Sequence, residues 1–242
     1  MVTFGEMVRQ FSNFRQRAAV DEKDGRGDFA WGQYETPLAS YQKEFARLMP
    51  SIVSHLKRRK RDKPTFAMDV MSAGKAIRDL AETGAITGGL SVTLNDWRSE
   101  STRIGDSKMG VDVLAGNILY GTVTRKIRDW IGEKSRNNPH FDLIMCNPGL
   151  GFVSFPSGPI GMGLVENIFW TGISLLDPNG GTMLAYIPTY VWGDRAKISE
   201  WVEAINKAGA GLRVEWTTPY DYENGQYILK AVREQSDKVN VF

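Results

Sequence analysis

An asparagine and a proline follow a short apolar run, and their chemistry suits a ligand site. Residues 141–146 read as a buried strand that stops at Asn147-Pro148-Gly149. Asn147 then places a side-chain amide, and Pro148 a free carbonyl, at the carboxyl end of the strand. In open parallel α/β sheets, ligands bind at that edge. The alternative is an ordinary turn after an ordinary strand, and the surrounding chain decides between the two.

The first predicted strand ends in a turn of small residues. The segment Asp69-Val-Met-Ser-Ala-Gly-Lys has Ser72, Ala73 and Gly74 at its centre. Small side chains let a ligand approach the backbone closely, and the helix that follows presents free N–H groups. Such a turn suits a phosphate-like or carboxylate group, although Asp69 is also a common turn residue.

The next two strands also end in polar groups. Asp96 ends the second strand, where a carboxylate can accept hydrogen bonds from ribose hydroxyls. Asn117 ends the third strand and can read an adenine edge. Singly, Asp96 is explained as a helix N-cap and Asn117 as a loop residue. Together with the small-residue turn they favour a nucleoside site.

Other chemical motifs are incomplete. Residues 73–76 resemble the end of a P-loop, but Ala76 stands where a serine or threonine should bind magnesium. Residues 158–163, Gly-Pro-Ile-Gly-Met-Gly, follow the wrong element for a dinucleotide fingerprint, and we interpret them as a loop. With only Cys146 and the distant His55 and His140, no metal-ligand spacing exists and neither histidine pairs with an activated serine. Cys146 lies in an apolar run, which is typical of an inert buried thiol.

A sheet must bring these strand ends together, and the chain after Pro64 predicts one. Strands alternate with helices, which indicates a doubly wound α/β fold with a mostly parallel seven-stranded sheet. The last two strands have no helix between them, so we expect an antiparallel final strand pair. The predicted strands are 65–71, 90–94, 111–115, 141–146, 182–187, 212–217 and 227–232, and the predicted helices are 76–82, 122–131, 164–176 and 198–208.

Residues 1–63 predict an N-terminal helical extension ahead of a Rossmann-like domain at 64–242. Apolar residues recur at helical spacing over 1–20, and a charged, glycine-rich loop follows at 21–28. Thr36-Pro37 looks like a helix start with Pro at the first helical position, and the amphipathic pattern then runs from Leu38 to Leu56. A basic run follows, which fits either contacts with DNA or RNA phosphates or a solvated helix end; its cations are Lys57, Arg58, Arg59, Lys60, Arg61 and Lys63.

Composition places the chain among globular proteins. Its 242 residues are 42% hydrophobic and 24% charged, which is enough to bury a substantial core. No apolar run is long enough to span a bilayer, and the start lacks the pattern of a secretory signal. A single cysteine allows no disulfide within the chain. We therefore expect a cytoplasmic protein without membrane association; the oligomeric state is not indicated.

Residues 64–234 resemble the class I S-adenosylmethionine-dependent methyltransferases. The resemblance rests on the order of the strand ends (Asp69 to Gly74, Asp96, Asn117, Asn147-Pro148), on Leu-Leu-Asp-Pro-Asn-Gly-Gly-Thr at 175–182 and on the closing strand pair. It implies a Rossmann-like fold and S-adenosylmethionine as the cofactor. The sequence departs from the family in the first turn, where Met71, Ala73 and Lys75 replace glycines.

A narrower resemblance concerns the acceptor. Residues 32–37, Gly-Gln-Tyr-Glu-Thr-Pro, are similar to a segment of the amino-directed N6-adenine DNA methyltransferases, and 146–148 look like the start of their Asn-Pro-Pro-Tyr/Phe motif. This resemblance implies that Thr36 touches the methionine end of the cofactor. It also implies that Asn147 and the Pro148 carbonyl accept hydrogen bonds from a target amino group, and that Phe152 stacks on a base flipped out of its duplex.

The implied cofactor contacts are Thr36, Asp69, Ser72, Ala73, Gly74, Asp96, Trp97, Asn117 and Asn147. The function that follows is a methyltransferase acting on an amino group of nucleic acid. A protein or a small molecule would use similar acceptors and stays open as the substrate. The altered turn also leaves open a catalytically inactive methyltransferase-like fold that binds nucleic acid or protein. A nicotinamide-dependent oxidoreductase is disfavoured by the missing glycine fingerprint and the paired final strands.

Overall fold

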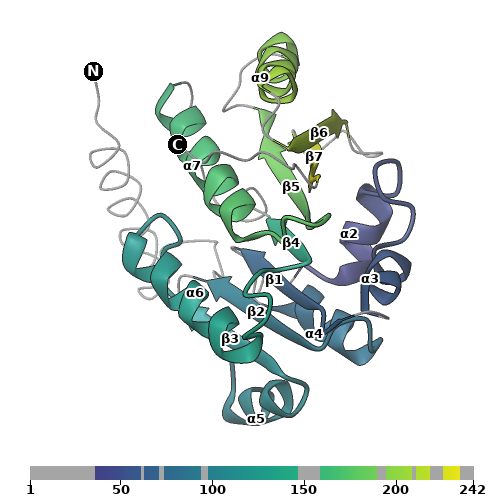
Figure 1. Ribbon diagram of the computed structural model, residues 1–242, viewed down its shortest axis with the longest axis vertical. Coiled ribbons are helices and arrows are strands. Elements are labelled where there is room, and N and C mark those ends of the chain that lie inside the picture. The colour runs from purple at the N-terminus through teal and green to yellow at the C-terminus, as the bar shows by residue number, and fades with distance from the viewer. Residues whose placement is uncertain are drawn as a thin grey trace, which may run out of the picture.

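The computed structural model describes residues 36–60, 63–70, 74–93, 98–146, 159–189, 195–208, 211–218 and 226–234. These residues form a seven-stranded sheet of order β3-β2-β1-β4-β5-β7-β6. Figure 1 shows this sheet with helices on both of its faces. The strands are β1 (Phe66–Val70), β2 (Gly88–Thr93), β3 (Val111–Ala115), β4 (Leu143–Cys146), β5 (Thr182–Pro188), β6 (Leu212–Thr217) and β7 (Gln226–Arg233).

The strand directions match the predicted doubly wound sheet. β1 pairs in parallel with both β2 and β4, β2 with β3, and β4 with β5. β7 is antiparallel to β5 and to β6, so the predicted antiparallel final pair is confirmed. β7 lies between β5 and the edge strand β6, and it pairs with β6 in the antiparallel manner of a hairpin.

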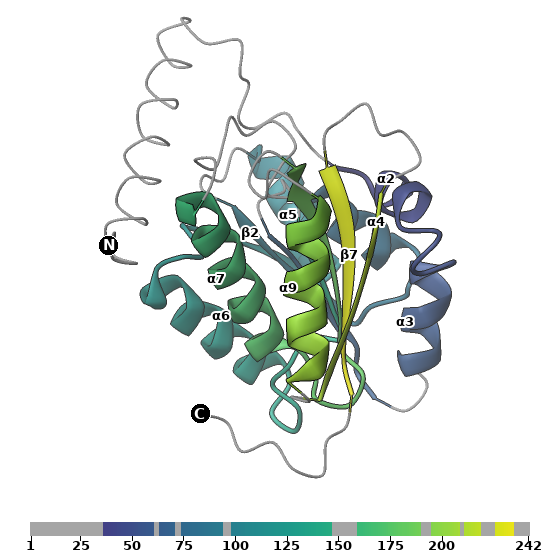
Figure 2. The same ribbon diagram turned by 90° about the horizontal axis from the view of Figure 1, so that it is seen from above.

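Two helical layers cover the sheet (Figure 2). One hydrophobic cluster joins one face to α2 (Leu38–Glu44), α3 (Ile52–Lys60) and α4 (Lys75–Glu82). A second cluster joins the other face to α6 (Gly121–Lys134), α7 (Pro159–Leu175) and α9 (Arg195–Lys207). α5 (Glu100–Lys108) lies beside the edge strand β3. In none of the described ranges does a helix combine the length and hydropathy of a membrane span.

Alternation along β1 sorts its side chains between the two layers. Phe66, Met68 and Val70 belong to the cluster with α6, α7 and α9, whereas Ala67 packs with α2, α3 and α4. By the period of two, Asp69 lies on the same face as Ala67. α4 approaches this face closely because β2 has glycine there: a Cβ on Gly89 would lie 2.2 Å from the Ile77 side chain.

The described half of the N-terminal extension is part of the same core. The rings of Tyr41 and Phe45 lie 5.5 and 5.1 Å from the ring of Tyr186 on β5. All three side chains are almost fully buried. Residues 36–60 therefore pack as a layer of the sheet domain; the boundary at 63/64 stays a prediction, and the predicted helix at 1–20 lies outside the described residues.

Four details of the predicted elements are wrong. The helix expected over 38–56 is two helices, α2 and α3, because Pro50 removes a backbone donor and disfavours helical geometry before it. Pro37 is the cap of α2 and not its first helical residue. Residues 159–163 belong to α7 and not to a loop, with Pro159 at the first helical position. The exposed helix α5 was not predicted at all.

Candidate functional site

The strand order locates the most favourable ligand site. The order of the parallel strands reverses between β1 and β4, because β2 and β3 lie on one side and β4 and β5 on the other. In open α/β sheets, ligands bind outside the carboxyl ends of the strands at such a reversal point. Val70 pairs with Cys146 at this edge. The loops that continue from them, 71–73 and 147–158, lie outside the described residues.

Gly74 shapes the turn that leads from β1 into α4. It caps α4 in the left-handed region, with φ of 82°, which residues with a side chain rarely adopt. A Cβ there would lie 3.3 Å from Ser91 on β2 and 3.4 Å from Arg78 on α4. Gly74 also provides no side-chain cap, so the first-turn N–H groups of α4 keep their capacity to donate to a ligand.

Asp79 on α4 anchors the start of α2 beside this turn. Its carboxylate accepts a hydrogen bond from the Leu38 N–H at 2.9 Å, and it forms an ion pair with Lys75. The hydrogen bond to Asp79 raises the pKa of Lys75, which therefore stays charged. Thr36 stands two residues before Leu38 and is 5% exposed. Thr36 is therefore buried just before α2, and its contact with the methionine end of the cofactor stays a prediction.

Asp69 is fully buried near the end of β1. Burial, and then the negative charge of Asp69, raises the pKa of the Tyr41 hydroxyl. The same two causes raise the pKa of the Cys146 thiol, so Cys146 is a protonated core residue and not a nucleophile. Asp69, Tyr41 and Cys146 therefore lie close enough to interact electrostatically, near the carboxyl ends of β1 and β4.

Asn117 lies just past β3 and is 9% exposed. Its Oδ1 accepts a hydrogen bond from the Leu119 N–H at 3.0 Å, and its backbone carbonyl accepts one from Tyr120 at 2.9 Å. These contacts form the turn before α6, which is the loop role considered from the sequence. A ligand at Asn117 would meet an amide whose oxygen is already engaged.

The remaining predicted site residues lie outside the described residues. Among the described ones, Thr36 lies just before α2, Asp69 lies on β1 and Gly74 at the start of α4, and Asn117 lies two strands away along the same edge. The others stay predictions: Ser72, Ala73, Asp96, Trp97, Asn147, Pro148 and Phe152.

An arginine-carboxylate cluster beside the Gly74 turn was not found from the sequence. Asp106 on α5 is 1% exposed and forms ion pairs with Arg78, at 3.6 Å, and with Arg98. Arg78 is itself buried on α4. The cluster joins α4 to the residues that follow β2 and so braces both flanks of the predicted nucleoside site. The one available signal was Ser99, whose side chain caps α5 by accepting from the Thr102 N–H.

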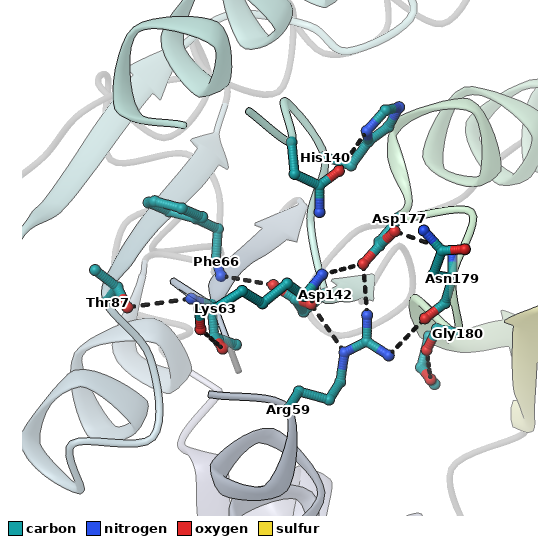
Figure 3. A network of polar contacts seen from close by, with 12 residues as sticks. Arg59, Lys63, Phe66, Thr87, His140, Asp142, Asp177, Asn179 and Gly180 are labelled. Atoms are coloured by element: carbon teal, nitrogen blue, oxygen red, sulfur yellow. Dashed lines mark hydrogen bonds and ion pairs between the residues drawn. The ribbon is translucent and has the colours of Figure 1, made fainter. Parts of the chain in front are cut away.

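The basic run at the end of α3 lies at the opposite edge of the sheet. Figure 3 shows Arg59 between Asp142, which precedes β4, and Asp177, which precedes β5. Arg59 donates to both carboxylates, at 2.8 and 2.7 Å, and to the Asn179 carbonyl at 2.9 Å. Lys63 contacts both carboxylates as well.

Lys60 is also held within the fold, since its ammonium donates to the carbonyls of Gly84 and Ile86. Lys57 and Arg58 are exposed, whereas Arg61 lies outside the described residues. The nucleic-acid role of this run stays a prediction that concerns Lys57 and Arg58 foremost. Arg59, Lys60 and Lys63 have a structural role, because they tie α3 and its following loop to the amino edge of the sheet.

Comparison with known proteins gives structural likeness without sequence relatives. No protein-family model matches the chain, and no curated protein matches it. Among solved structures, it is similar to the plantazolicin methyltransferase BpumL in complex with SAH, at 10% identity and a TM-score of 0.49, over 84% of this chain and 87% of that one. The N-methyltransferase NodS from Bradyrhizobium japonicum WM9 is similar at 13% identity and a TM-score of 0.44, over 79% of this chain and 97% of that one.

A spermidine synthase in complex with the transition state analogue AdoDATO is also similar, at 13% identity and a TM-score of 0.45. The likeness covers 78% of this chain, which spans 60% of that synthase. Several of the similar structures are thus named as methyltransferases.

Proposed function

We propose that this chain is an S-adenosylmethionine-dependent methyltransferase whose site lies at the carboxyl edge of β1 and β4. One observation carries the proposal. The switch point of a doubly wound sheet coincides with a side-chain-free helix start at Gly74, next to a buried carboxylate and to the anchored start of α2. That arrangement suits a ligand with both a nucleoside and a charged amino-acid end.

The described residues fit S-adenosylmethionine at two points. The turn at Gly74 has φ of 82°, and a Cβ there would press on Ser91 and Arg78, so glycine lets α4 begin close against β2 at the carboxyl edge of the sheet. Thr36, two residues before the Leu38 N–H that Asp79 on α4 holds, would contact the methionine end. Asp96 would hold the ribose hydroxyls. When bound, S-adenosylmethionine supplies an electrophilic methyl group.

The proposed acceptor is an amino group of nucleic acid, similar to adenine N6. Asn147 and Pro148 directly follow the last residue of β4, at the switch point. An exocyclic amine is a poor nucleophile because its lone pair is delocalised into the ring. Two acceptors, the Asn147 side chain and the Pro148 carbonyl, would draw the N–H bonds out of the ring plane and free the lone pair. Phe152 would stack on the base.

A methyl-transfer assay tests this function. The purified chain is incubated with S-adenosylmethionine carrying a radiolabelled methyl group and, separately, with DNA, RNA, a protein extract and a metabolite extract. Label in nucleic acid that is lost in Asn147→Ala supports the proposal. Label confined to protein or small molecules refutes the acceptor while keeping the reaction. Cofactor binding without transfer to any pool would instead identify a binding module.

A further inference from the structure

A groove between α6 and α7 lies outside the site described above. Figures 1 and 2 both show the two helices side by side on one face of the sheet. The groove has a volume of about 400 Å³, which is within the usual range of ligand sites. Its apolar end is formed by the buried Ile118 and Leu119, which directly follow Asn117. The groove therefore begins where the carboxyl edge of β3 ends.

The walls of the groove are polar and carry positive charge. Arg125 and Arg128 lie three residues apart on α6, so they project from the same side of the helix. Asn167 and Thr171, four residues apart on α7, form the opposite wall. A guanidinium fork matches the oxygens of a phosphate group, and an amide and a hydroxyl can complete the hydrogen bonding.

Neither arginine is neutralised within the described part of the chain. Arg125 forms no ion pair there, and Arg128 makes only a long hydrogen bond of 3.4 Å to the Ser174 hydroxyl on α7. None of the described residues that line the groove is acidic. Asp129 on α6 is exposed and is not among the lining residues, and Glu166 on α7 hydrogen-bonds to Trp201 on α9. Two uncompensated cations across from polar groups indicate an anionic ligand.

An exposed aromatic ring accompanies the arginines. Trp170 is 44% exposed and lies next to Thr171, on the same side of α7 as Asn167. Its ring packs edge-on against Phe169, with the ring centroids 5.1 Å apart, and the rest of the ring meets solvent. Cations interleaved with exposed rings are typical of surfaces that bind single-stranded nucleic acid, where phosphates meet the cations and unpaired bases stack on the rings.

We infer that the α6–α7 groove binds the phosphate backbone of a single-stranded nucleic acid, with Arg125 and Arg128 as the phosphate contacts and Trp170 as a stacking platform. This rests on the proposed function in one respect: it names the form of nucleic acid that would reach the methyl-transfer site. Because the groove starts beside Asn117, a strand held in it would leave toward the carboxyl edge of the sheet.

Binding is measured by fluorescence anisotropy on the full chain, without cofactor, using a labelled short oligothymidine, its RNA counterpart and a duplex. The variant Arg125→Ala/Arg128→Ala is compared with Lys126→Ala/Arg136→Ala, which removes equal charge from exposed positions off the groove. We expect the groove variant to weaken single-strand binding about tenfold and to lower the slope of log affinity against log salt by about 1.4, for two lost contacts. Trp170→Ala should weaken it at least about fivefold.

Three results would overturn the inference. Equal losses in the groove variant and its control would show general electrostatic attraction. Preference for the duplex would exclude a single strand. Binding of inorganic phosphate or AMP, measured by calorimetry, with no binding of oligonucleotide, would identify a small phosphorylated ligand.

Failure of the groove and failure of the proposed function are separable. Methyl transfer to nucleic acid with an unchanged KM in the Arg125→Ala/Arg128→Ala variant would refute the groove and keep the function. Oligonucleotide binding that depends on the two arginines, in a chain that does not bind S-adenosylmethionine, would keep the groove and refute the proposed function. Thermal unfolding of each variant confirms that it is folded.

Discussion

Replacing Arg59 with methionine removes one guanidinium and keeps the apolar stem of the side chain. Asp142 and Asp177 are 1% and 0% exposed, and Arg59 donates one hydrogen bond to each. In the variant, two buried carboxylates share the single ammonium of Lys63, whose side chain is 30% exposed. One negative charge of the two buried carboxylates then has no balancing cation.

The size of the effect follows from this imbalance. Removing one partner of a buried ion pair costs about 3–5 kcal/mol. Asp142 keeps the hydrogen bond from the Phe66 N–H at 2.9 Å, and Lys63 remains, so we expect the lower end, about 3 kcal/mol. Urea unfolding measures this as a lower midpoint with an unchanged slope.

Two further variants make the test specific. Arg58→Met removes an exposed cation from the same helix and should change stability by less than about 0.5 kcal/mol. Adding Asp177→Asn to Arg59→Met should restore part of the loss, because the excess charge disappears. If the unfolding free energy of Arg59→Met lies within about 0.5 kcal/mol of that of the parent chain, the network does not hold α3 to the sheet and the reasoning fails.

The network also sets a pH dependence. Burial raises the pKa of Asp177, but the contacts with Lys63, the Asn179 N–H and Arg59 lower it more, so the net pKa lies below the ordinary value of 3.8. The ionised form therefore adds stability that is present above pH 3.8 and is lost as the pH falls below it toward the folded pKa. The difference between Arg59→Met and the parent chain should shrink over this range. A constant difference would contradict the charge argument.

Four further predictions concern single positions. Burial and the neighbouring arginines lower the pKa of His55 from 6.5 to about 4, so His55 should cost the chain stability as the pH falls from 6.5 to 4. His55→Phe should reduce that slope in urea unfolding, and an unchanged slope would exclude His55. Gly74→Ala should cost about 1–2 kcal/mol of stability and also weaken S-adenosylmethionine binding in calorimetry, whereas Gly84→Ala, with φ of 66° and open space around it, should cost only the stability; equal affinities in both would remove Gly74 from the site. Asp96→Ala should weaken cofactor binding by about 1.5–3 kcal/mol, and an unchanged affinity would refute its role. Asn147→Ala should leave cofactor binding intact but abolish methyl transfer, and an unchanged turnover would refute its role.

The sheet was predictable because its strands are short apolar runs that end in glycine, proline or polar residues. α5 was missed because its residues are polar and largely exposed, so no apolar period marks it. The break between α2 and α3 was marked by Pro50, but the apolar pattern continues through it and hid the break. The periodic spacing of apolar residues thus located the helices and strands that form the core. It failed for an exposed helix and for a break within a continuous apolar pattern.

Long-range charge partners limited what the sequence could say about the site. The basic run at 57–63 fitted either phosphate contacts or a solvated helix end, and neither reading anticipated that Arg59 bonds to Asp177, 118 residues away. The cluster of Arg78 with Asp106 and the groove of Arg125 with Asn167 also join separate elements. Such pairs depend on tertiary packing, so neighbouring residues do not mark them. The start of α4 after Gly74 was predictable, because the strand and the helix on either side of it are defined by local sequence.

Titration of the purified chain with S-adenosylmethionine by calorimetry, with S-adenosylhomocysteine and NAD as comparisons, tests the proposed cofactor site most directly. We predict micromolar one-to-one binding of both adenosyl ligands and no binding of NAD, with weaker binding in Gly74→Ala than in Gly84→Ala. Absence of binding by either adenosyl ligand, in a chain shown to be folded, would contradict the assignment of the β1–β4 edge as a methyltransferase site.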